Sequence, residues 1–222
     1  LRSSAASDVY KRQPITFSNL LGWGSGSIDK VAIKAFLGDE QLGIYSFVLQ
    51  LAQIFKLGVE SFLKSVNVLI YKNLDKISLF TQSRMMFIAI FHFSAFLYFT
   101  LIIFLQEMDL FMNYPVPISL FVILILSRVI LLSNFMEVIF FYAKTNSKSV
   151  TISNLISFIF LVLIVIPCVT IFGLEGVATS IFLYAIINYI ILNFLHKSKK
   201  RIIFFNSLLL ALPLALLLIN YV

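Results

Sequence analysis

The sequence places ionisable side chains inside long apolar runs, where they could bind a charged ligand or an ion. An ionised side chain at the centre of a membrane costs at least about 2.5–3.5 kcal/mol on insertion scales, so it usually faces a bundle interior or a water-filled cavity. Such residues often mark the pathways of substrates and ions. Six of them are the candidate ligand-binding residues of this chain: Asp29, Lys30, Lys34, Lys56, Glu60 and Arg128.

The first three candidates lie in the apolar segment 15–37. Lys30 and Lys34 are four residues apart and would share one face of a helix, whereas Asp29 would point about 100° away from Lys30. Asp29 could therefore neutralise a charge on a neighbouring helix. Three glycines lie in the five residues from Gly22 to Gly26. Because glycine weakens a helix, we predict a bend at this point.

The other candidates lie in later apolar segments. The spacing of Lys56, Glu60 and Lys64 predicts one charged helix stripe with internal pairing. An alternative is an interfacial helix whose lysines reach the lipid headgroups. Arg128 lies near the middle of 117–142, too deep to reach the headgroups easily. It either binds a ligand or forms a structural pair with an acid on another helix, such as Asp29.

The composition predicts which elements hold these residues. The chain of 222 residues is 60% hydrophobic and 12% charged, with a mean hydropathy of +1.01. Because soluble proteins are about a quarter charged, we predict an integral membrane protein. The apolar runs do not alternate with polar residues as barrel strands do, so we predict an all-α bundle. The net charge of +7 comes mostly from the ends of apolar runs and does not indicate nucleic acid binding.

Segments of about 20 apolar residues are long enough to cross a membrane. Seven such spans are predicted: 15–37, 42–71, 84–105, 117–142, 150–171, 174–195 and 202–221. The junctions that carry Lys or Arg (72–84, 143–149, 196–201) alternate with junctions that carry neither (38–41, 106–116, 172–173). By the positive-inside rule, residue 14 then lies on the cytoplasmic side and Val222 on the external side.

No predicted connection is long enough for a soluble catalytic domain. The sequence contains no nucleophile elbow, phosphate-cradling loop, CxxC or HExxH motif, and it has a single cysteine. We therefore expect no enzymatic activity, no cofactor and no metal.

The first residues, 1–13, are polar and lack a helical period. They resemble a translated sequencing adapter, so we exclude them from the fold as an artefact or a disordered tail. We expect the remaining residues, 14–222, to form a transmembrane lobe, and the true start of the gene to be missing. The alternative is a genuine short cytoplasmic tail.

The stretch 27–52, "SIDKVAIKAFLGDEQLGIYSFVLQLA", resembles the start of the C-terminal half of bacterial polysaccharide flippases. These export O-antigen and exopolysaccharide and belong to the multidrug/oligosaccharidyl-lipid/polysaccharide superfamily. The pattern of that family is matched by an Asp-Lys pair (29–30), an "FLG" turn (36–38) and an "LGxYS" helix start (42–46). The stretch 172–192 also resembles a late helix hairpin of the family.

This resemblance implies a two-lobed transporter of twelve or fourteen helices, of which this chain supplies one lobe and an N-terminal lobe is missing. Alternating access would occur by rocking of the lobes around a central cavity. The implied substrate is an undecaprenyl-diphosphate-linked oligosaccharide in the bacterial cytoplasmic membrane. We expect Arg128, Lys30 and Lys34 to line the cavity, with Asp29 as a balancing or ion-coupling acid. Lys56 and Glu60 are further candidates.

Three other functions were weighed against the sequence resemblance. An ion-coupled drug antiporter of the same superfamily would favour an acidic cavity, whereas the intramembrane charges here are more basic than acidic. A membrane-embedded polysaccharide polymerase or acyltransferase would usually need a large external loop or a placed His or Asp. A scaffold or assembly subunit is the third alternative, and the depth of Arg128 argues against it. The sequence therefore favours the flippase.

Overall fold

The computed structural model describes residues 2–72, 77–108, 116–143 and 146–195, and these residues form helices without strands. The all-α prediction is confirmed for this part of the chain. The helices are α1 (Arg2–Ser25), α2 (Ile28–Leu37), α3 (Asp39–Lys72), α4 (Ile77–Glu107), α5 (Ile118–Ala143) and α6 (Ser147–Leu195).

Four of the helices are long and apolar enough to cross a membrane. They contain the stretches Asp39–Val68, Met86–Glu107, Ile118–Ile139 and Ser147–Leu195. The chain is thus a membrane protein by the length and composition of its helices. The number of seven spans is not confirmed, and the predicted span 202–221 lies outside the described residues.

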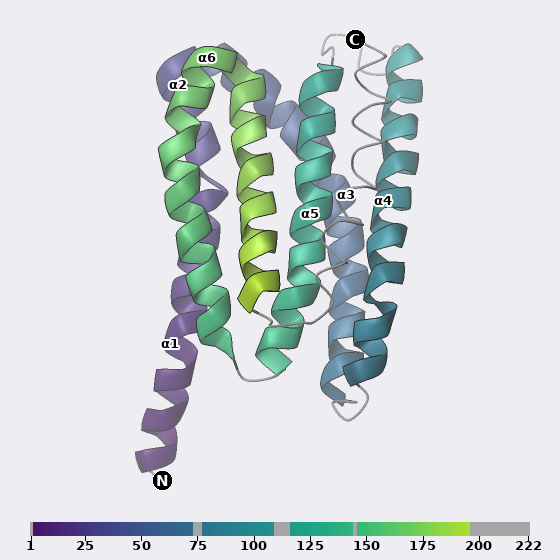
Figure 1. Ribbon diagram of the computed structural model, residues 1–222. Helices are drawn as coiled ribbons and strands as arrows, with labels where there is room; N and C mark the ends of the chain where they lie inside the picture. The colour runs from purple at the N-terminus through teal and green to yellow at the C-terminus, as the bar shows by residue number, and fades with distance from the viewer. Residues whose placement is uncertain (1, 73–76, 109–115, 144–145, 196–222) are drawn as a thin grey trace.

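The helix α6 is two antiparallel arms joined at Gly173 (Figure 1). Gly173 has φ 61° and ψ −136°, a left-handed conformation that glycine adopts without steric cost. The arms correspond to the predicted segments 150–171 and 174–195, and the turn lies where the sequence placed it.

We expect Gly176→Ala to destabilise this hairpin. A Cβ at Gly176 would overlap the backbone carbonyl of Cys168, so the two arms would have to separate. Overpacking of this kind typically costs about 1–3 kcal/mol. The matched control is Gly43→Ala in α3, where a Cβ meets nothing within 4 Å. Thermal unfolding in detergent should show a lower midpoint for Gly176→Ala alone, and equal midpoints would contradict the close approach.

The predicted span 15–37 is not one helix, which corrects that prediction. It divides into α1 and α2 at Gly26 and Ser27, the bend expected from the glycine-rich segment. Neither α1 nor α2 is among the helices able to cross a membrane. The helix α1 also begins at Arg2, so residues 2–13 are helical although their sequence lacks a helical period.

A single non-helical residue, Gly38, separates α2 from α3. Its φ of 89° is a conformation that favours glycine, and its N–H donates a hydrogen bond to the Ile33 carbonyl at 3.1 Å. The predicted 38–41 junction is therefore shorter, because Asp39 and Glu40 already belong to α3. With 34 residues, α3 is about 51 Å long. Because the hydrocarbon core is about 30 Å thick, α3 must tilt or extend beyond it.

The central helix of the bundle is α5, which packs against α3, α4 and α6 (Figure 1). The helices α1 and α2 pack against α6 on the other side. Successive long helices run in alternating directions in Figure 1, so the start of α3, the end of α4 and the turn of α6 lie at one end of the bundle. At that end, Ser119 Oγ donates a hydrogen bond to Glu175 Oε1 at 2.5 Å. Which end faces the cytoplasm stays a prediction.

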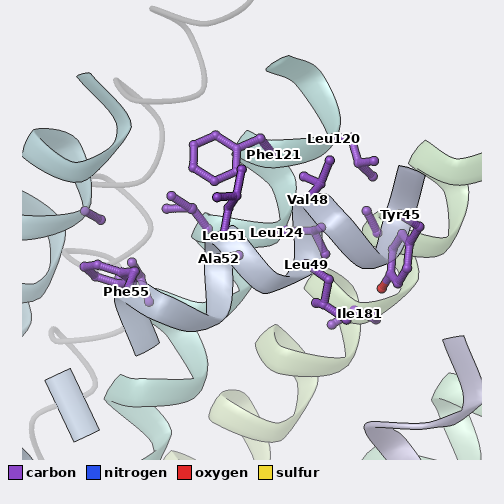
Figure 2. Packing of buried hydrophobic residues seen from close by; sticks show 14 of the residues in the cluster. Tyr45, Val48, Leu49, Leu51, Ala52, Phe55, Leu120, Phe121, Leu124 and Ile181 are labelled. Carbon is purple, nitrogen blue, oxygen red and sulfur yellow. The ribbon is translucent and has the colours of Figure 1, made fainter. Parts of the chain in front are cut away.

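The packing of α3 against α5 forms much of the apolar core. Figure 2 shows Val48 and Leu51 of α3 facing Leu120 and Phe121 of α5. Each of these side chains is at most 9% exposed. This contact fixes the relative position of the two helices that carry most of the candidate site.

A chain of polar side chains ties α1 to both arms of α6. Asn188 Nδ2 donates to Asn154 Oδ1 at 2.9 Å, and Asn154 Nδ2 donates to Ser18 Oγ at 2.5 Å. Ser153 Oγ donates to the Asn188 carbonyl at 3.2 Å. Interhelical hydrogen bonds of this type hold helices together in a membrane, where apolar surface alone provides little driving force.

Candidate functional site

The buried carboxylate of Asp29 is the first element of the candidate site. Asp29 shares one face of α2 with Ala32 and Ile33, and this face packs inward, leaving Asp29 only 2% exposed. Tyr45 of α3, which is fully buried, donates its hydroxyl to Asp29 Oδ2 at 2.7 Å. The backbone N–H of Lys30 donates to Asp29 Oδ1 at 2.8 Å. Both oxygens of the carboxylate are therefore hydrogen-bonded.

Arg128 of α5 is the second element. Its side chain is half-buried, and its Nε atom is buried without a hydrogen-bond partner among the described residues. The ion pairs found in the described part of the chain are Lys34–Asp39 and Lys56–Glu60, and Arg128 takes part in neither.

The third element is the pair formed by Lys56 and Glu60 on α3. Lys56 Nζ lies 3.2 Å from Glu60 Oε1, which confirms the internal pairing expected from their spacing. The two side chains are 37% and 26% exposed, so the pair is partly buried.

Asp29, Tyr45, Lys56, Glu60 and Arg128 are called the charge cluster below. Three helices position it: α2 holds Asp29, α3 holds Tyr45 and the Lys56–Glu60 pair, and α5 holds Arg128. Four of the six residues predicted from the sequence are among these five, and the structure joins Asp29 to Tyr45 by a hydrogen bond and Lys56 to Glu60 by an ion pair.

The structure does not bring Lys30 and Lys34 into this group. Both side chains lie on the exposed face of α2, while Asp29 points inward. Lys34 Nζ instead forms an ion pair with Asp39 Oδ1 at 3.2 Å, across the turn at Gly38. The rotation of about 100° between adjacent helical residues explains why Asp29 and Lys30 face different surroundings.

Tyr45 was not predicted as a site residue. It lies in the "LGIYS" stretch, but a tyrosine in an apolar helix ordinarily packs or anchors at the interface. The hydrogen bond to Asp29 joins residues 16 positions apart, on different helices. Only the packing of α2 against α3 could reveal it.

Arg128 provides the kind of donor that recognises anions. The Asp29 and Glu60 carboxylates already have donor partners, whereas Arg128 retains an unused donor at Nε. A guanidinium presents five N–H donors in a planar fork that matches the oxygens of a carboxylate or a phosphate. No group of three or more His, Cys, Asp or Glu side chains suited to a metal occurs in the part of the chain that the structure describes.

Comparison with known proteins identifies no family for this chain. No family model, no curated protein and no solved structure matches the chain. The functional argument therefore depends on the charge cluster and on the sequence resemblance described above.

Proposed function

We propose that this protein transports an undecaprenyl-diphosphate-linked oligosaccharide across the bacterial cytoplasmic membrane for surface polysaccharide synthesis. The observation that carries the proposal is the Arg128 guanidinium in the middle of α5, which keeps a buried donor without an acceptor while the neighbouring acids have partners. A diphosphate supplies the anionic oxygens that such a donor set binds.

The net charge of the cluster does not by itself favour an anionic ligand. Asp29 and Glu60 contribute −2, and Lys56 and Arg128 contribute +2, so the sum is zero. Arg128 Nε is a buried donor of the cluster that has no partner among the described residues. This favours a diphosphate over the organic cation that a drug antiporter would carry.

In the proposed mechanism, this lobe and a second lobe enclose a cavity that opens to either side of the membrane in turn. Arg128 holds the diphosphate near the middle of the membrane, where a lipid-linked headgroup has no other counter-charge. Lys30 and Lys34, exposed on α2, would contact the substrate only where the second lobe adjoins this one. The substrate crosses unchanged, without bond cleavage.

The test uses the product of the complete reading frame, reconstituted into proteoliposomes with a fluorescent lipid-linked diphosphate oligosaccharide. We expect the glycan to become accessible to an impermeant glycosidase much faster than in protein-free vesicles, with the lipid otherwise recovered intact. Export of ethidium without movement of the lipid would favour the drug antiporter. Elongation or hydrolysis of the lipid-linked glycan in the absence of added enzyme would favour a membrane enzyme.

A further inference from the structure

A second buried carboxylate, which the proposed mechanism does not use, belongs to Glu137 of α5. Its side chain is 0% exposed, and it lies within the stretch Ile118–Ile139 that is long and apolar enough to cross a membrane. An acid inside a membrane span is costly, so it usually faces the bundle interior and marks a site for an ion or another polar ligand. The polar groups beside Glu137 indicate which ligand the carboxylate suits.

The neighbouring polar group on the same face of α5 is the amide of Asn134. Asn134 precedes Glu137 by three residues, which places the two Cβ atoms about 5–6 Å apart. Asn134 is 3% exposed, and its Nδ2 donates a hydrogen bond to the Ala185 carbonyl of α6 at 3.1 Å. Because only the amino group of an amide can donate to a carbonyl, this contact fixes the direction of Oδ1. Asn134 Oδ1 is buried and has no hydrogen-bond partner among the described residues.

The second arm of α6 covers this face of α5. Hydrogen bonds from Ser119 to Glu175 and from Asn134 to Ala185 join successive levels of the two helices, so α5 and this arm run in the same direction (Figure 1). Glu137 lies about one turn beyond the Asn134–Ala185 contact, and it is fully buried. A ligand at this point would lie between two packed helices, so it must be small.

The two side chains offer oxygen ligands to a hard cation. Carboxylate and amide oxygens bind cations such as Ca²⁺ and Mg²⁺, which take several oxygens each. The single carboxylate of Glu137 balances one positive charge, whereas a divalent ion would leave a net charge in a region where charge is strongly desolvated. A proton would need only the carboxylate, whereas Asn134 Oδ1 adds a second oxygen of fixed direction. This ligand set therefore suits a small monovalent metal ion.

We propose that Glu137 and Asn134 bind a sodium ion between α5 and the second arm of α6. The Glu137 carboxylate supplies the charge, and Asn134 Oδ1 supplies a neutral ligand that the Ala185 contact holds in place. Because the ion binds only where the helices are packed, it stabilises the folded protein by mass action. This site is separate from the charge cluster, and the inference does not depend on the proposed function.

The test compares the product of the complete reading frame in sodium chloride and in choline chloride at equal ionic strength. The thermal unfolding midpoint in detergent should rise saturably by several degrees with sodium, because a ligand of the folded state stabilises it. Binding of radioactive sodium to the same preparation should saturate over the same concentrations. Equal midpoints in sodium and choline, or a rise with calcium and none with sodium, would overturn the proposal.

Two variants locate the site. Glu137→Gln keeps the size of the side chain and removes its charge, so it should weaken sodium binding at least tenfold, since losing even an indirect partner of a metal ligand costs about 10–100-fold. Asn134→Leu keeps a similar volume and removes Oδ1, and it should weaken sodium binding by roughly tenfold. The matched control is Glu107→Gln, the same change at an exposed acid of α4, which should keep the wild-type response to sodium.

The salt comparison separates ion binding from a structural role. If Glu137 and Asn134 only maintained the packing, each variant would lower the midpoint equally in sodium and choline and would keep the sodium-dependent difference. That outcome would overturn the site. If one variant does not fold, the other variant and the wild-type comparison decide.

Discussion

Replacement of Arg128 by alanine is expected to abolish transport of the lipid-linked oligosaccharide while leaving the protein inserted in the membrane. Removing one partner of a buried, hydrogen-bonded charge pair costs about 2–5 kcal/mol, or roughly 30-fold to several thousand-fold in affinity. We expect this effect because the guanidinium lies mid-helix in α5, with a buried Nε that has no hydrogen-bond partner among the described residues. The measurement is the rate at which the glycan becomes accessible in proteoliposomes.

Replacing Arg128 by alanine should leave the other contacts of the charge cluster in place. Without Arg128, Asp29 keeps its hydrogen bonds from Tyr45 and Lys30, and Glu60 keeps its ion pair with Lys56. The yield in the membrane fraction and the elution profile in detergent should therefore match the wild type. Arg128→Lys retains the charge but loses the planar fork, so we expect partial transport. Normal transport by Arg128→Ala would exclude a ligand-binding role for this residue.

The elements that the sequence predicted best are those whose apolar runs are uninterrupted. The segment 117–142 corresponds to α5 within one residue at each end, and the arms of α6 follow 150–171 and 174–195. A long apolar run has one stable solution in a membrane, because only a helix satisfies its backbone internally. Gly173 then specifies the turn, since its φ of 61° is unfavourable for other residues.

Predictions that depend on contacts between helices were less complete. Helical geometry indicated that Asp29 points away from Lys30, but it could not identify the facing side chain, which is Tyr45 of α3. Spacing alone found the Lys56–Glu60 pair, because both partners lie on one helix. A site assembled from α2, α3 and α5 depends on how these helices pack. The residue pattern within one helix does not determine which side chains of the other helices it contacts.

Phe121→Ala is expected to produce the largest loss of stability among core substitutions in α5. Phe121 is 1% exposed, and its ring lies with centroids 6.2 Å from the rings of both Tyr98 and Phe99 of α4. It also faces α3 in the core (Figure 2). Truncating a buried phenylalanine costs about 3–5 kcal/mol through lost contacts and the cavity left behind. The thermal unfolding midpoint in detergent should fall by many degrees.

Phe93→Ala in α4 is the matched control for this prediction. Phe93 is 64% exposed on the outer surface, where lipid tails replace the contacts of the missing ring. Its unfolding midpoint should stay close to that of the wild type. Because the contact of α3 with α5 also positions Tyr45 and Arg128, Phe121→Ala should weaken diphosphate binding in protein that remains folded, whereas Phe93→Ala should not. Equal losses of stability in the two variants would show that the α3–α4–α5 contact is not the core on which the charge cluster depends.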